Sequence, residues 1–263
     1  MKKIFIAVLA VAALASCSKE EAINVNQGEA ISFENAFVEN ATRATDLTTT
    51  NLQDFGVYGT VAKGGNSALI FNNTKVYKSG NAFKYDVAQY WVAAADYTFT
   101  AVAPFTNAKW TYAPETTTLS FNNETAVAEQ DVLLAYVAKT TEDVLTAENT
   151  QPVAFTFKHI LSKVAFKFQN AFADGNTTLD VYNVKINNTA KSGTMLIDNG
   201  ADQAWVVADD LAVPFGKAAA DGVVIDNGET LNVAHQYIIP ASREYDITFD
   251  VDLYQADVKL ATY

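Results

Sequence analysis

Apolar and polar side chains alternate along much of the chain beyond residue 54, and this alternation predicts a succession of short β-strands. The most regular case is residues 246–253. Its apolar side chains, expected to face the core, are Ile247, Phe249, Val251 and Leu253. The intervening side chains, expected to face solvent, are Asp246, Thr248, Asp250 and Asp252. A slip of one residue would bury three aspartates, so the pattern predicts a strongly fixed register.

Other segments predict strands of the same kind. They are residues 75–78 and 82–86, joined as a hairpin by the turn at Ser79-Gly80-Asn81, and residues 97–103, 131–139, 153–158, 163–169, 179–187, 193–197 and 258–263. In residues 179–187 the pattern places Tyr182, Val184 and Ile186 on one face. Residues 131–139 are apolar on both faces, which indicates a central strand.

A polar segment, residues 140–151, separates two groups of strands and is interpreted as a domain boundary. Many short strands with turns between them are typical of sandwiches and barrels. We therefore predict an all-β protein with two β-sandwich domains in tandem, residues 44–150 and 151–263.

The N-terminus has the features of a bacterial lipoprotein signal. Lys2 and Lys3 precede an apolar run, residues 4–14, that is too short to span a bilayer comfortably. Small residues then lead directly to Cys17. We interpret residues 1–16 as the signal peptide and Cys17 as the lipidation site, where two or more acyl chains would give stable anchoring to the outer membrane. Acidic residues after Cys17 favour exposure at the cell surface.

Residues 17–43 combine a polar tether with one apolar segment. Residues 31–38 alternate well enough to predict a strand that contains Ile31, Phe33, Phe37 and Val38. Residues 39–50 contain one large apolar residue, Leu47, and are expected to form an exposed loop around Arg43.

Composition narrows the possible functions. The chain has 263 residues, is 49% hydrophobic and carries a formal net charge of −12, so it can bury a core and would repel nucleic acid. Cys17 is its only cysteine, which leaves no intrachain disulfide and no thiolate metal site.

Candidate catalytic and binding chemistry is sparse, and we expect neither an enzyme nor a cofactor. His159 and His235 each lie beside apolar strands, without a second ligand at metal spacing, and are interpreted as hydrogen-bonded residues at strand ends. Acidic groups in residues 198–202, 209–210, 221 and 226 lack a complete calcium loop. Exposed aromatics could stack on sugars, but packing is the favoured interpretation of Tyr90-Trp91, Trp110 and Trp205.

Several motifs occur in an order that resembles the fimbrillin-like (Mfa-like) family of Bacteroides-type bacteria. They are the lipidation motif ending in Cys17, Arg43-Ala44-Thr45, Phe55-Gly56-Val57-Tyr58, Tyr90-Trp91, residues 97–104, residues 157–164 and Tyr237-Ile238-Ile239-Pro240. The resemblance implies a fimbrial subunit or related surface protein built from two transthyretin-like sandwiches. It further implies cleavage between Arg43 and Ala44, removal of the strand at residues 31–38, and its replacement by a strand from a neighbouring subunit.

Other readings stay open at this stage. The chain stops at Tyr263, within the strand predicted for residues 258–263, whereas family members usually continue. This predicts either a truncated chain or an incomplete C-terminal domain. The main alternative function is a monomeric surface lipoprotein that binds a glycan or host ligand. The third possible function is a glycan hydrolase, but the sequence shows no recognisable pair of catalytic carboxylates.

Overall fold

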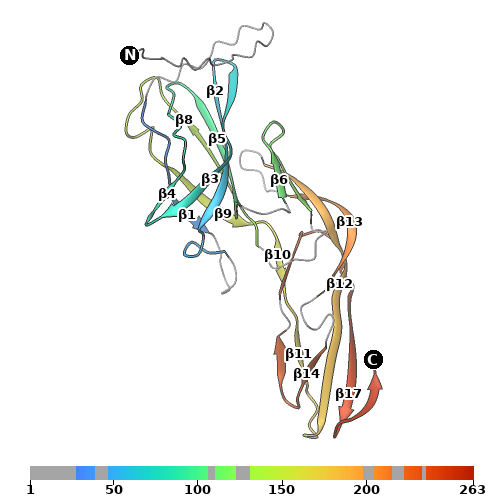
Figure 1. Cartoon of the computed structure of the whole chain (residues 1–263). Helices are drawn as coiled ribbons and strands as arrows, with labels where there is room; N and C mark the ends of the chain where they lie inside the picture. The colour runs from blue at the N-terminus through green and yellow to red at the C-terminus, as the bar shows by residue number, and fades with distance from the viewer. Residues whose placement is uncertain are drawn as a thin grey trace, which may run out of the picture.

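The computed structural model describes residues 28–38, 47–105, 110–122, 131–197, 204–214, 222–232 and 235–263. Within these ranges the chain forms strands, turns and bends and no helix, so the predicted all-β class is confirmed. The molecule is elongated: strands from the first part of the chain form one end, and strands from the last part form the other (Figure 1).

Seven strands close into a barrel in the order β1-β4-β3-β2-β5-β8-β9. They are β1 (Phe33–Val38), β2 (Asp54–Lys63), β3 (Asn66–Ser79), β4 (Ala82–Lys84), β5 (Asp96–Ala103), β8 (Leu133–Thr140) and β9 (Val153–His159). The predicted hairpin across Ser79-Gly80-Asn81 is formed by β3 and β4. β1 closes the barrel, because it pairs antiparallel with β4 and parallel with β9.

Aromatic side chains fill the barrel. The main ones, all nearly inaccessible to solvent, are Phe33, Phe55, Phe71, Phe99, Phe155 and Phe157. β8 lies between β5 and β9, with Leu133 in the barrel core and Leu134 in a second core on the other face. The prediction of a central strand at residues 131–139 is therefore confirmed.

A second sheet has the order β18-β17-β12-β7-β6, with two further strands paired to β12. Its members are β6 (Trp110–Ala113), β7 (Thr118–Asn122), β12 (Thr177–Leu196), β13 (Trp205–Pro214), β14 (Val223–Ile225), β17 (Ile247–Gln255) and β18 (Val258–Thr262). The sequence predicted separate strands at residues 179–187 and 193–197, which was wrong: both belong to β12. The predicted common face of Tyr182, Val184 and Ile186 was wrong for Tyr182, whereas Val184 and Ile186 lie in the same core. The register on β17 shifts between Tyr182 and Lys185, and Asn183 in this stretch has a positive φ.

Two short strand pairs complete the fold. They are β10 (Ser162–Val164) with β16 (Gln236–Ile238), and β11 (Lys167–Gln169) with β15 (Thr230–Asn232). The sequence predicted one strand over residues 163–169, whereas the chain changes partner between β10 and β11. Val164, Phe166 and Phe168 nevertheless pack together against the same small core, around Val181 and Ile225.

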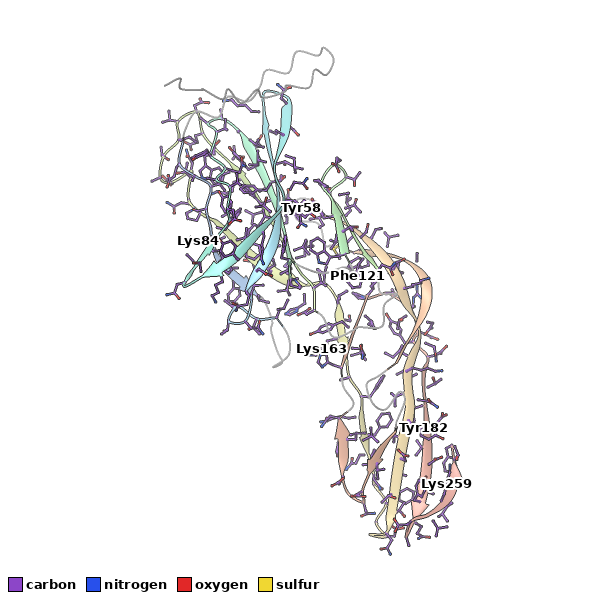
Figure 2. The ribbon with its side chains drawn as sticks, viewed as in Figure 1. Tyr58, Lys84, Phe121, Lys163, Tyr182 and Lys259 are labelled. Carbon is purple, nitrogen blue, oxygen red and sulfur yellow. The ribbon has the colours of Figure 1, made fainter. Side chains whose placement is uncertain are left out.

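A continuous apolar core joins the barrel to the second sheet. Tyr58 and Leu134 reach it from the barrel, and Leu119, Phe121 and Met195 reach it from the sheet. Figure 2 shows Tyr58 and Phe121 on the two sides of this junction. The β6–β7 hairpin supplies much of the contact, since the ring of its Tyr112 lies 4.6 Å from the ring of Tyr58.

Strand pairing does not divide the chain at one position. β6 and β7 precede residue 150 and belong to the second sheet, whereas β9 follows residue 150 and belongs to the barrel. The predicted sandwich domains, residues 44–150 and 151–263, stay a prediction.

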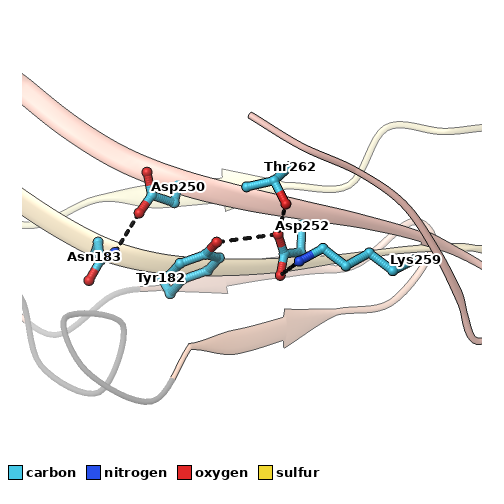
Figure 3. A network of polar contacts seen from close by, with 6 residues as sticks. All are labelled: Tyr182, Asn183, Asp250, Asp252, Lys259 and Thr262. Carbon is cyan, nitrogen blue, oxygen red and sulfur yellow. Dashed lines mark hydrogen bonds and ion pairs between the residues drawn. The ribbon is translucent and has the colours of Figure 1, made fainter.

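The predicted burial of β17 was partly wrong. Ile247 and Phe249 were expected in the core but are 48% and 43% exposed. Asp252 was expected in solvent but is only 7% exposed. Lys259 and Thr262 on β18 and Tyr182 on β12 cover this carboxylate and donate hydrogen bonds to it (Figure 3). The layer that faces β17, which includes β11, is small. Phe249 therefore packs against the ring of Phe168, 5.0 Å away between centroids, and the rest of its side chain is exposed.

Candidate functional site

The candidate functional site is the place in the barrel that β1 occupies. We call it the β1 seat, and define it as the facing edges of β4 and β9 together with residues 89–91. The segment that fills it begins before the strand itself: the N–H of Ile31 donates to the carbonyl of Gln89 at 2.8 Å, and that of Trp91 donates to the carbonyl of Glu29 at 3.0 Å. From Phe33 onward the pairing passes to β4 and β9.

Three side-chain contacts reinforce this backbone pairing. The hydroxyl of Tyr85 donates to the carbonyl of Ile31 at 2.6 Å. The hydroxyl of Thr150 donates to the carboxylate of Glu29 at 2.6 Å, and the N–H of Val38 donates to the hydroxyl of Thr49 at 2.9 Å. The segment is thus held at both ends and along its length.

Phe33 is the central side chain of the seat. Its ring centroid lies 5.4 Å from that of Phe71, 5.5 Å from Tyr85 and 5.6 Å from Phe155, on which it stacks. Ile31, Ala36 and Val38 are also buried in the barrel core. Burying an aromatic side chain of this kind contributes on the order of 1.5–3 kcal/mol from area alone, so β1 is an integral part of the barrel.

The sequence predicted most of the inward-facing residues of this segment but not Ala36. Ile31, Phe33 and Val38 face inward, but Phe37 is 55% exposed, and the inward position beside it belongs to Ala36. The reason is an irregularity in the pairing of β1 with β9 between Glu34 and Phe37. Alternation alone does not reveal a bulge, and a small residue such as alanine gives little signal of burial.

The predicted lipidation and processing residues lie outside the residues that the structure describes. Cys17, Arg43 and Ala44 therefore stay predictions from sequence. The two described residues that bracket Arg43 are Val38, at the end of β1, and Leu47, which leads to β2.

Leu47 contacts a buried carboxylate that also bonds to a histidine. Its N–H donates to Oδ2 of Asp131 at 3.2 Å, and the same oxygen lies 2.7 Å from Nδ1 of His159 at the end of β9. Asp131 is only 3% exposed. His159 is thus the hydrogen-bonded residue at a strand end that the sequence predicted, and through Asp131 it is linked to Leu47 in the segment before β2.

The aromatic residues considered for sugar stacking are mostly buried. Trp91 is fully buried with the amine of Lys139 4.9 Å from its ring, and Trp110 lies in the junction core. Trp205 packs at the edge of that core and donates its Nε1–H to the carbonyl of Ile160 at 2.8 Å. The packing interpretation is confirmed for these three residues.

The described part of the chain offers neither a metal site nor a membrane-spanning helix. It contains no group of three or more His, Cys, Asp or Glu that could hold a metal. It also contains no helix that is long and apolar enough to span a bilayer. His235 lies edge-on to Tyr237, at 5.5 Å between ring centroids.

One open groove lies on the second sheet, over β6, β7, β12 and β13. It has a volume of about 430 Å³, and hydroxyl and amide side chains, including Thr111, Ser120 and Thr194, line it. None of the lining residues is charged.

Comparison with solved structures supports the architecture. A structure described as a candidate cell adhesion protein from Bacteroides uniformis has a TM-score of 0.50 and 16% identity, and covers 87% of this chain and 81% of its own. A second such protein, from Bacteroides ovatus, has a TM-score of 0.44 and 16% identity over 89% and 84% of the two chains. A fimbrial protein from Bacteroides ovatus has a TM-score of 0.34 and 13% identity, and covers 90% of this chain but 46% of its own.

At this identity, the first of these neighbours shows a shared all-β fold and no more. Family membership comes from the sequence: the fimbrillin-like family matches residues 42–259, and the chain belongs to that family. No curated protein matches it. Membership supports a fimbrial or adhesin-like role at the cell surface.

Proposed function

We propose that the chain is a structural subunit or accessory component of a surface fimbria, assembled by exchange of β1. It would be exported as a lipoprotein, anchored in the outer membrane through acylated Cys17, and cut between Arg43 and Ala44. Its partners would be other fimbrial subunits, and its two parts would be the tandem transthyretin-like sandwiches that the family resemblance implies.

The observation that supports this function best is the position of β1. It is the first strand in the described part of the chain, it closes the barrel, and a break at Arg43 would separate it from everything that follows. Its removal would expose one edge of β4, one edge of β9 and an aromatic pocket around Phe71, Phe99 and Phe155. Unpaired strand edges readily accept another extended segment, so an open seat would favour assembly.

The contact between Asp131 and His159 supports the same model. It holds Leu47 in place three residues beyond Ala44. A cut at Arg43 would therefore free the segment upstream of the cut, while the downstream end stays attached to the barrel.

Cleavage can be tested with a matched pair of arginines, because the chain has only two, Arg43 and Arg243. We expect Arg43→Ala to leave a full-length lipidated monomer and to abolish polymer ladders on gels. Arg243→Lys, at a site where the guanidinium donates to the carbonyl of Asn188, should leave processing and polymer unchanged. Equal polymer from Arg43→Ala would overturn strand exchange after this cut.

Anchoring needs a separate measurement. We expect Cys17→Ala to accumulate as unlipidated precursor, and mass spectrometry of the wild-type chain from cells to find acylated Cys17 or a free Ala44. A wild-type N-terminus at Cys17 without acyl chains would contradict the anchor and leave the assembly model to the first experiment.

A further inference from the structure

β1 does not fit its seat regularly. In its parallel ladder with β9, Phe33 lies opposite Val153 and Glu34 opposite Ala154, but the next pairs are Phe37 with Thr156 and Val38 with Phe157. β1 therefore takes five steps where β9 takes four, and two residues, Asn35 and Ala36, share one position opposite Phe155. Such a bulge leaves one extra residue unpaired and interrupts the ladder.

β9 itself is regular over the same stretch. Val153, Phe155 and Phe157 are buried, and Ala154 and Thr156 between them are exposed. The pairing of β9 with β8 is confined to Lys158 and His159, so β1 is the strand that pairs with residues 153–157. The irregularity thus belongs to the occupant and not to the seat.

We propose, on the basis of the exchange function proposed above, that the bulge makes β1 bind its seat weakly. The seat then selects a strictly alternating strand from a neighbouring subunit. A strand without the extra residue can place inward side chains opposite Val153, Phe155 and Phe157 in an unbroken ladder. Exchange would then replace the interrupted hydrogen-bond ladder between β1 and β9 with a complete one. This difference would favour the incoming strand over β1.

The pockets specify the side chains of the incoming strand. The first two positions, now Ile31 and Phe33, accept large apolar groups, since Phe33 lies among Phe71, Tyr85 and Phe155. The third position, now Ala36, lies beside Phe155, whose ring is 5.6 Å from those of both Phe33 and Phe55 and thus leaves room for a small residue. The fourth, now Val38, takes a residue of medium size. The partner is thus an extended segment running parallel to β9 with large, large, small and medium apolar residues at alternate positions.

Deletion of Asn35 tests the proposal in the full chain. It removes one step and keeps both ends of β1 in register, because Phe33 can stay opposite Val153 and Val38 opposite Phe157. The chain would be purified from cells in an Arg243→Lys background, so that an arginine-specific protease has one site. The matched control is Asn35→Ala, which keeps the bulge.

For the uncut protein, we expect deletion of Asn35 to raise the urea midpoint, with no rise for Asn35→Ala. For the cut protein, the probe is a fluorescent synthetic peptide of residues 29–38 without Asn35, added in excess. One regained hydrogen bond changes a rate or binding constant by up to about tenfold. We therefore expect the peptide to enter the deletion variant about tenfold more slowly than it enters the wild type, because β1 of the variant is held more tightly. Against cut wild type, it should bind about tenfold more tightly than the unmodified peptide of residues 29–38.

The outcomes separate the two proposals. Failure of every peptide to enter the cut wild-type chain would overturn exchange at this seat, whereas the urea midpoints would still report whether the bulge weakens β1. A midpoint that is unchanged or lowered by deletion of Asn35, or equal binding of the two peptides, would overturn selection by alternation.

Discussion

At the scale of single residues, Asp131 has the most completely buried charged side chain in the described part of the chain. Its carboxylate has two donors, the imidazole of His159 and the N–H of Leu47, and both reach the same oxygen. Removing one partner of a buried hydrogen bond leaves the other partner unsatisfied in a medium of low polarity. This pair should therefore matter more for stability than any exposed charge.

We expect Asp131→Asn to lower the free energy of unfolding by about 1–3 kcal/mol, measured by urea denaturation. The control is Asp143→Asn, which alters an exposed aspartate in the loop after β8 and should change stability by less than about 0.5 kcal/mol. Equal urea midpoints for the two variants would contradict the role given to the pair.

Asp252 is the second buried carboxylate, and its hydrogen bonds make it sensitive to pH. Donation from Lys259 and then from Thr262 lowers the pKa of Asp252, and the bond to Asp252 raises the pKa of Lys259. Because the folded-state pKa of Asp252 lies below that of an unfolded aspartate, the stabilisation is complete above about pH 4 and is lost as the pH falls further through the folded value.

This shift predicts that β18 loosens before the rest of the second sheet in acid. Hydrogen exchange should show β18 amides losing protection below about pH 4, ahead of the amides that β17 shares with β12. Asp252→Asn should remove most of this pH dependence, whereas Asp250→Asn, whose side chain bonds to Asn183, should keep it. Simultaneous loss of protection in β17 and β18 would contradict a local effect.

At the scale of elements, β1 offers a direct comparison of its two faces. Phe33 and Phe37 are the same residue type on the same strand, but one lies in the barrel core and the other is largely exposed. We expect Phe33→Ala to lower the free energy of unfolding by about 3–5 kcal/mol and Phe37→Ala by less than about 0.5 kcal/mol, both from urea denaturation. A similar loss from each would mean that β1 is not seated in this register.

Alternation in the sequence identified the strands but not their irregularities. Residues 97–103 became β5 and residues 153–158 became β9, because their inward side chains follow a period of two without interruption. The bulge at Asn35 and Ala36 and the register shift near Asn183 reverse the facing of later residues. Local composition does not encode such steps, since they depend on which strand lies alongside.

Pairing between distant segments was the other feature beyond the reach of the sequence. Nothing in residues 110–122 indicates that they join β12 rather than the neighbouring barrel strands, and the burial of Asp252 depends on residues from two other strands. The candidate site was easier to find, because its evidence lies in one short segment, with an apolar strand on one side and an isolated arginine on the other.

At the scale of the whole molecule, the β6–β7 hairpin determines whether the two ends behave as one unit. It pairs with β12 through β7, and Tyr112 on β6 packs on Tyr58 and shares a hydrogen bond of 3.1 Å with the hydroxyl of Thr100. In the fimbrial role proposed above, the chain would have to transmit tension along its length, and the continuous core across the junction would couple the two parts.

We expect Leu119→Ala, which opens a cavity in this core, to lower the free energy of unfolding by about 3 kcal/mol, and Ser120→Ala on the opposite face of β7 to have little effect. Because the hairpin bridges both parts, the loss should appear equally in the slowest-exchanging amides of β5 in the barrel and of β12 in the second sheet. Hydrogen exchange resolved by segment makes this comparison in a single sample. If β12 lost protection while β5 kept its wild-type value, the two parts would be independent folding units joined by a passive contact. Tension would then pass through the β9–β10 connection rather than through the hairpin.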